Sequence, residues 1–341
     1  MKKKILLWLI LGILAALLLW IVISILTSSG VWNVIFRNAT AFDRNIPAPD
    51  FAGKSYERVA YSEVSPSDYL DLYVPDSEEP MPLLICVHGG GFVSNDSQSR
   101  QATLMYQYFR ANGYAVATIN YRLAQEAQFP LPLSDVKAAV RFLRANAEQY
   151  GYDPERFAIW GESAGGYLAV MAAVTDDGEY DMVPFIGEDP KNPVSGKVDA
   201  LIDFYGILDF PYAGSDFAES GIPLWLNRIT GGGDDTDNSV VTMFLGRRLS
   251  ELTTQELNEI SPSYRAERLD KNSLKVYVAH GTVDITVARK QSERFYDAMV
   301  KSQGADAVEY HPMQNLKHAD DRFYTPENLA PVKAFLDRVW E

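Results

Sequence analysis

The sequence has a single cysteine, few histidines and a deficit of positive charge. Cys86 is the only cysteine, so no intrachain disulfide can form, and metal sites built on cysteine pairs are excluded. It lies in an apolar run, residues 83–87, where a small buried side chain is expected. Lys and Arg number 31 against 45 Asp and Glu, a formal net charge of -14. So acidic a chain repels phosphate backbones, which argues against a nucleic-acid partner.

Charge is also absent from residues 5–26, an apolar run that follows Lys2-Lys3-Lys4. About 20 apolar residues suffice to cross the hydrocarbon core of a bilayer. We therefore expect residues 1–30 to comprise cytoplasmic lysines and a transmembrane signal anchor, and residues 31–50 to be a linker. The lysines predict a single-pass protein of the cell membrane with its globular domain outside the cytoplasm. The alternative is a signal peptide cleaved near residues 27–30, which would give a secreted protein.

Residues 51–341 alternate strand-like and helix-like patterns, which indicates an α/β fold. Strands are predicted at 56–64, 69–74, 83–88, 114–119, 156–160, 200–205, 274–280 and 307–311, and helices at 99–112, 134–150, 163–174, 287–303 and 326–339. This order predicts a mostly parallel sheet of about eight strands, covered by helices on both faces. The short connection between the first two strands predicts an antiparallel edge.

Two stretches interrupt this alternation, residues 176–198 and 211–263. Insertions after the carboxyl ends of strands surround the ligand crevice in open α/β sheets. We expect the second stretch to form a cap or lid. The other possibility is a solvated loop without function.

A Gly-x-Ser-x-Gly motif, Gly161-Glu-Ser-Ala-Gly165, lies between the strand pattern at 157–160 and the helix pattern at 167–171. In this context the motif presents its serine on a strained strand-to-helix turn. Ser163 is therefore the candidate nucleophile. Such a serine also needs a base, a group that orients the base, and donors for the oxyanion.

The oxyanion donors are expected in His88-Gly-Gly-Gly-Phe92, which directly follows a strand. Glycines there can turn backbone N–H groups toward an acyl oxygen. The candidates are the amides of Gly90 and Gly91, together with that of Ala164. The alternative is a plain glycine hinge. Because His88 precedes the serine in the chain, we expect it to be structural.

The base and the acid follow the serine in the chain order of this type of hydrolase. Of the four histidines, His318 lies in a polar loop after the last strand, where a base can reach the turn. His311, in a strand pattern, is the second candidate. Asp284, just after the preceding strand, is the expected acid. Asp320 and Asp321 are too close to His318 in sequence to orient it.

Several motifs together resemble the α/β-hydrolase esterases related to hormone-sensitive lipase, and above all bacterial carboxylesterases that include feruloyl- and acetylxylan-esterase-like members. They are His88-Gly-Gly-Gly-Phe92, Asn120-Tyr-Arg-Leu-Ala124, Phe129-Pro with Asp135, Gly161-Glu-Ser-Ala-Gly-Gly166, Phe204-Tyr-Gly206 and His280-Gly-Thr-Val-Asp284. The resemblance covers about residues 50–341 and implies the triad Ser163, Asp284 and His318. Two positions depart from the family pattern: Lys317 stands where a glycine is common, and Val287-Ala288 where Val-Pro is common.

The function expected from these residues is that of a serine hydrolase, which cleaves small carboxylic esters of short to medium acyl chains through an acyl-enzyme, without metal or cofactor. A membrane-anchored serine peptidase of the same fold is one alternative, because the same triad also cleaves amides. A catalytically silent binding protein on a hydrolase scaffold is the other.

Overall fold

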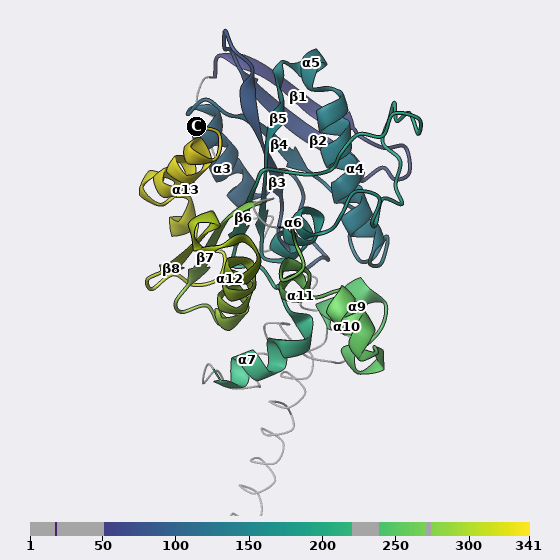
Figure 1. Cartoon of the computed structure of the whole chain (residues 1–341), viewed down its shortest axis with the longest axis vertical. Coiled ribbons are helices and arrows are strands. Elements are labelled where there is room, and N and C mark those ends of the chain that lie inside the picture. The colour runs from purple at the N-terminus through teal and green to yellow at the C-terminus, as the bar shows by residue number, and fades with distance from the viewer. Residues whose placement is uncertain (1–17, 19–50, 220–238, 271–273) are drawn as a thin grey trace, which may run out of the picture.

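The structure of the chain is a computed structural model that describes Leu18 and residues 51–219, 239–270 and 274–341 (Figure 1). Apart from Leu18, the predicted membrane segment and linker lie outside the described residues. No helix within the described ranges is long and apolar enough to span a bilayer.

All eight predicted strands form, and they build one sheet. The strands are β1 (Gly53–Ala60), β2 (Tyr69–Pro75), β3 (Met81–Val87), β4 (Ala115–Ile119), β5 (Tyr152–Glu162), β6 (Ala200–Phe204), β7 (Lys275–Gly281) and β8 (Val308–Met313). Their order in the sheet is β1-β2-β4-β3-β5-β6-β7-β8. Strand β2 runs antiparallel to β1 and β4, and all other pairs are parallel. The mostly parallel sheet with an antiparallel edge is thus confirmed.

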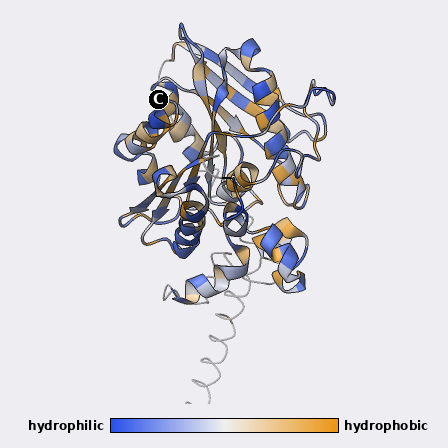
Figure 2. Ribbon diagram, in the orientation of Figure 1, coloured by the Kyte–Doolittle hydropathy of each residue, from blue (hydrophilic) through white to orange (hydrophobic). Residues whose placement is uncertain are grey.

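Helices cover both faces of this sheet (Figure 1). One face carries α3 (Arg100–Arg110) and α13 (Pro326–Val339), and the other carries α4 (Leu131–Ala145), α6 (Ala164–Val174) and α12 (Lys290–Gln303). Because side chains alternate along a strand, β3 sends Ile85 into the core below α4 and α6, and Cys86 into the core below α3 and α13. In Figure 2, α4 bears hydrophobic and hydrophilic residues side by side, as expected of a helix with one face on a core.

Several helix boundaries differ from the predicted ones for local reasons. The helix predicted at 134–150 is divided into α4 and α5 (Ala147–Tyr150), because Asn146 leaves the helical conformation and its side-chain amide donates to the Phe142 carbonyl. The helix predicted from residue 163 begins one residue later, since Ser163 has φ 52°. The helix predicted from residue 287 begins at Lys290.

The region predicted as a cap, residues 211–263, holds short helices beyond the carboxyl ends of the strands (Figure 1). They are α7 (Ala213–Glu219), α9 (Val240–Leu245), α10 (Thr254–Glu259) and the start of α11 (Pro262–Ala266). Residues 220–238 of this region lie outside the described residues.

Asp209, which follows β6 and is fully buried, ties this region to the body. Its carboxylate accepts hydrogen bonds from the hydroxyls of Ser261 (2.5 Å) and Ser263 (2.7 Å). Arg294 of α12 contacts the same carboxylate at 3.3 Å and pairs with Asp216 of α7 at 2.6 Å. One buried acid and its arginine partner therefore join α7 and the start of α11 to the core.

Candidate active site

Ser163 lies on a sharp turn between β5 and α6, with φ 52° and ψ -119°. Such a left-handed conformation is strained for a residue other than glycine. The two flanking glycines make the turn possible. A Cβ at Gly161 would lie 2.3 Å from the Gly165 carbonyl oxygen, and a Cβ at Gly165 would lie 2.2 Å from that of Val87. The Gly-x-Ser-x-Gly spacing is thus a steric requirement of this elbow.

The three residues of the predicted triad form one chain of hydrogen bonds. The Ser163 hydroxyl lies 2.9 Å from His318 Nε2, and His318 Nδ1 lies 2.7 Å from Asp284 Oδ2. A carboxylate can only accept, so Nδ1–H donates to Asp284 and Nε2 accepts the serine proton. These residues come from the loops after β5, β7 and β8, which the parallel sheet brings to one edge.

Asp284 is buried and held on both carboxylate oxygens. Its Oδ1 accepts hydrogen bonds from the backbone N–H groups of Thr286 (2.7 Å) and Val287 (3.0 Å). Burial by itself raises the pKa of Asp284, but the charge of His318 and hydrogen bonds from His280 and His318 outweigh it and hold that pKa well below its usual range. Asp284 therefore stays ionised wherever the protein is folded near neutral pH.

His280 contacts this acid, a role that the sequence reasoning missed. Nδ1 of the fully buried imidazole lies 2.8 Å from the Ser292 hydroxyl, and Nε2 donates to the Val287 carbonyl (3.0 Å), with Asp284 Oδ2 at 3.2 Å. The available signal was its position four residues before Asp284 in His280-Gly-Thr-Val-Asp284. The Val287 backbone thus accepts a hydrogen bond from His280 and donates one to Asp284. It does so although Val287-Ala288 departs from the family pattern.

The glycine loop after β3 lies against the elbow. A Cβ at Gly89 would come within 3.2 Å of the Ser163 Cβ. Gly90 and Gly91 have φ 124° and 61°, which side chains disfavour. Within the described residues, no backbone hydrogen bond has the N–H of Gly90 or Gly91 as its donor. The Ala164 N–H lies in the first turn of α6, where helical partners are lacking. Over the described residues, these three amides thus have no backbone acceptor.

Other motif residues support this loop from behind. Ala124 N–H donates to the Phe92 carbonyl at 2.8 Å. Arg122 and Asp135 form a bidentate pair at 2.9 and 2.6 Å, and Asp135 is fully buried. His88 stacks on Tyr121, and burial lowers the pKa of its imidazole, so it stays neutral. A structural position for His88 agrees with expectation.

The rival titratable residues lie elsewhere. His311, the second candidate base, stacks on Tyr277 with ring centroids 4.2 Å apart and lies 3.0 Å from Glu309. Asp320 pairs with Arg322 at 2.7 Å, and Asp321 pairs with Arg100 at 3.0 Å. The structure therefore brings His318 to the serine, whereas these groups have other partners. Over the described part of the chain, no cluster of three or more His, Cys, Asp or Glu residues is arranged to hold a metal ion.

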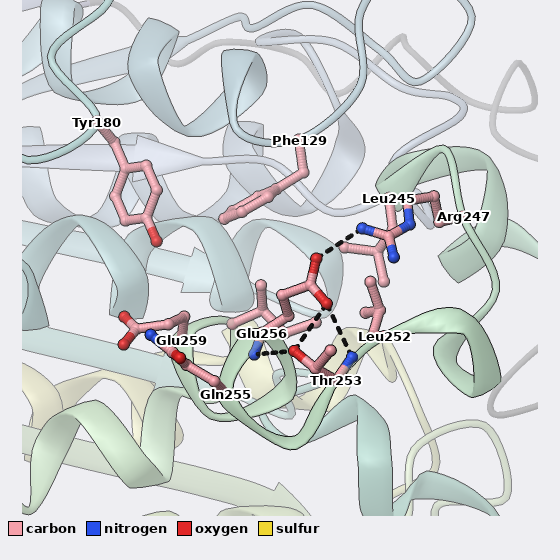
Figure 3. Close-up of a pocket in the computed structure, with 10 residues that line it drawn as sticks. Phe129, Tyr180, Leu245, Arg247, Leu252, Thr253, Gln255, Glu256 and Glu259 are labelled. Atoms are coloured by element: carbon pink, nitrogen blue, oxygen red, sulfur yellow. Dashed lines mark hydrogen bonds and ion pairs between the residues drawn. The ribbon is translucent and has the colours of Figure 1, made fainter.

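A cluster of aromatic rings beside α6 borders a cavity next to the region predicted as a cap. Tyr167, one turn after Ser163 on α6, packs at 5.6 Å from Phe244 and at 6.4 Å from Phe129, and its hydroxyl donates to the Ile260 carbonyl at 3.0 Å. One of these rings, Phe129, also lines a cavity of about 390 Å³, whose other lining residues are Tyr180, Leu245, Arg247, Leu252, Thr253, Gln255, Glu256, Glu259 and Ile260 (Figure 3).

Charged groups in this cavity pair with their neighbours. Glu256 accepts hydrogen bonds from Arg247 (2.7 Å) and from the hydroxyl of Thr253 (2.8 Å), as Figure 3 shows. Glu259 pairs with Arg265. The first contact ties the loop after α9 to α10, and the second ties α10 to α11. The cavity thus lies between residues of the region 245–260 and two side chains from elsewhere in the chain, Phe129 and Tyr180.

Comparisons with known proteins agree with this architecture. The sequence profile of the BD-FAE family matches residues 70–299, more than half of the chain. The esterase LipC of Mycobacterium tuberculosis is 26% identical over 268 residues, which cover 77% of this chain and 59% of LipC. LipM of the same organism, a probable carboxylic ester hydrolase, is 26% identical over 266 residues, which cover 77% of this chain and 56% of LipM. The chain thus spans less than two thirds of the length of these relatives.

Among solved structures, a truncated carbohydrate esterase from gut microbiota superimposes with a TM-score of 0.70 at 22% identity, over 86% of this chain and 98% of that one. At that identity the likeness concerns the fold. Together with the sheet order and the serine elbow, these matches place the polypeptide among the α/β hydrolases: the chain belongs to the BD-FAE family.

Proposed function

We propose that the protein is a serine esterase that hydrolyses small carboxylic esters. The observation that carries this function is the hydrogen-bonded chain from Ser163 through His318 to Asp284, with the serine on its elbow. A serine hydroxyl is a weak nucleophile at neutral pH, and this arrangement supplies the base and the group that orients it. The names of LipC and LipM support the reaction type.

In the first half of the reaction, Ser163 Oγ attacks the ester carbonyl while its proton passes to His318 Nε2. The carbonyl oxygen becomes an oxyanion, which the N–H groups of Gly90, Gly91 and Ala164 stabilise. Asp284 holds the imidazole and balances its positive charge. The carbon–oxygen bond to the alcohol then breaks, and the alcohol leaves with the proton from His318.

In the second half, water attacks the acyl-serine and gives a proton to His318 Nε2. A second oxyanion forms in the same place. Its collapse breaks the bond to Ser163 Oγ, which regains the proton, and the carboxylic acid is released. All proton transfers use groups of this chain, and no redox step occurs.

The substrate range that we propose is esters of short to medium acyl chains. On the oxyanion side, Gly91 faces the Val240 side chain of α9, whose Phe244 stacks on Phe92 with ring centroids 3.9 Å apart. These packed side chains bring the cap close to the reacting centre. We expect them to limit the space available to a long acyl chain.

A panel of p-nitrophenyl esters tests both the reaction and this range. We expect turnover of the acetyl and butyryl esters, a decline toward the octanoyl ester and little turnover of the palmitoyl ester. The matched acetyl p-nitroanilide should stay uncleaved. Preferential cleavage of the anilide or of peptides would favour a peptidase. Failure of both substrate types, together with no labelling by a fluorophosphonate, would favour a silent binding protein and contradict an esterase.

We also propose that residues 1–30 anchor the enzyme in the cell membrane with the catalytic domain outside the cytoplasm. The proposal rests on the apolar run at 5–26 and the lysines before it. Deletion of residues 1–30 should move the protein from the membrane fraction to the soluble fraction and leave kcat/KM unchanged, because the described domain begins after residue 50.

Fractionation of the full chain beside the deletion variant provides the control. A deletion variant that needs detergent to stay in solution would contradict a simple anchor. Recovery of the full-length product from the medium, with a new N-terminus near residue 30 by mass spectrometry, would show the cleaved signal peptide instead.

A further inference from the structure

A buried carboxyl that the proton relay does not use lies directly before the nucleophile. Glu162 is the last residue of β5, and only 3% of its surface is exposed. The Tyr205 hydroxyl lies 3.0 Å from Glu162 Oε2, and the Tyr324 hydroxyl contacts the same oxygen. The two hydroxyls also lie 2.5 Å from each other. Three side chains thus form a closed triangle of oxygen atoms.

This triangle joins the elbow to the segment that carries His318. Tyr205 follows β6, and its ring packs edge-on against the His318 imidazole, with centroids 4.8 Å apart. Tyr324 ends a short 3-10 helix, Asp321–Tyr324, just after the histidine loop. Tyr205 and Ala319 have φ values of 44° and 52°. Residues other than glycine keep such values only where their surroundings hold them.

The number of protons available to the three oxygen atoms depends on the charge of Glu162. Each tyrosine supplies one hydroxyl proton, so an ionised Glu162 leaves two protons for three oxygen–oxygen contacts. A protonated carboxyl supplies the third. Burial raises the pKa of Glu162 to about 7, although the bonds from Tyr324 and Tyr205 and the charge of His318 act against that rise. The carboxyl therefore changes charge near neutral pH.

Few other titratable groups face this carboxyl. They are Tyr324, Tyr205 and His318, the buried Cys86 thiol of β3 and the buried Tyr121 after β4. Burial raises the pKa of the Cys86 thiol and of the Tyr121 hydroxyl, so both stay neutral. His318 is thus the cation that a Glu162 carboxylate would act on.

We propose that Glu162 is a positioning residue of the active site, which with Tyr205 and Tyr324 holds the His318 loop and places a second negative charge behind the imidazole. The proposal rests on the esterase function proposed above. During acyl transfer His318 becomes positive, and a nearby carboxylate favours that form. Full activity then requires an ionised Glu162 and a neutral His318. The fall of kcat/KM toward acid pH should therefore depend on the binding of two protons, one by each residue.

Glu162→Gln tests this, because glutamine keeps the shape and an acceptor oxygen but carries no charge. We expect kcat/KM for p-nitrophenyl acetate at its plateau to fall about tenfold. The acid limb of the pH profile should then depend on one proton instead of two and move about 0.5–1 pH unit lower, since the carboxyl that loses its proton near neutral pH is gone. The rate of fluorophosphonate labelling between pH 5 and 9 should show the same change. Glu148→Gln, on the exposed surface of α5, is the matched control.

Tyr324→Phe provides a second variant, should the glutamine protein fold poorly. It keeps the carboxyl but removes a hydrogen bond to its ionised form, so Glu162 should hold its proton to higher pH. The acid limb should then move to higher pH, opposite to Glu162→Gln. A merely structural role would lower stability or plateau activity without moving the limb in opposite directions.

Two results would overturn the inference in different ways. In the first, the wild-type protein is active, but the pH profiles of Glu162→Gln and Tyr324→Phe keep the shape and midpoint of the wild-type profile. This result would overturn the role of Glu162 alone. Wild-type protein that neither reacts with the fluorophosphonate nor hydrolyses any ester of the panel would overturn the proposed esterase function, and the role of Glu162 with it.

Discussion

Ser163→Ala should lower kcat/KM for a short acyl ester by about 10⁴-fold or more, because the acyl-enzyme can no longer form. The remaining rate would come from the oxyanion donors and from substrate binding. Steady-state hydrolysis of p-nitrophenyl acetate measures the loss, and fluorophosphonate labelling should disappear with it.

The same variant should fold normally. Alanine keeps the Cβ and loses only the hydroxyl, whose bond to His318 is half-buried. The strain of the elbow, at φ 52°, is the same for both residues. Thermal unfolding followed by circular dichroism should therefore change little. A Ser163→Ala protein that is folded and retains turnover would refute the serine as nucleophile.

His318→Ala should be nearly as severe, with a loss of about 10³–10⁴-fold or more, because nothing else accepts the serine proton. The described neighbours cannot replace it: Asp284 lies behind the imidazole, and Glu162 is bound by two tyrosines. Labelling of Ser163 by a fluorophosphonate should slow in parallel, since the reagent also needs an activated serine.

His311→Ala is the control for this substitution. It removes another imidazole, one that stacks on Tyr277 and contacts Glu309 at the sheet edge. We expect activity close to wild type, with at most a small loss of stability. If His311→Ala proves the crippling change and His318→Ala retains turnover, the base has been assigned to the wrong histidine.

Strand positions could be predicted because they depend on local patterns. The run Leu83–Val87, for example, is apolar on both faces, as a central parallel strand requires, and it forms most of β3. The helix boundaries were less accurate. Asn146 leaves the helical conformation where its side-chain amide bonds to the Phe142 carbonyl, and Ser163 leaves it at the strained elbow. Neither departure changes the hydrophobic period.

The candidate triad could be predicted from chain order. Ser163, Asp284 and His318 each follow a strand, and parallel strands end at one edge of the sheet, so their loops must meet. Glycine spacing marked the elbow, because close backbone contacts there exclude side chains. His280, Tyr205 and Tyr324 were not assigned, since buried histidines and tyrosines occur throughout ordinary cores.

The sequence alone was therefore enough to predict the α/β architecture, the strained serine turn and the chain order of the candidate serine, acid and histidine. Each of these depends on residues that are neighbours in sequence or lie at the ends of adjacent strands. The second layer of the site required the folded chain. Glu162 and Tyr324 are 162 residues apart, and they meet only because the sheet brings the elbow beside the loop after its last strand. Their charge and proton count arise from burial, which no local pattern of residues records.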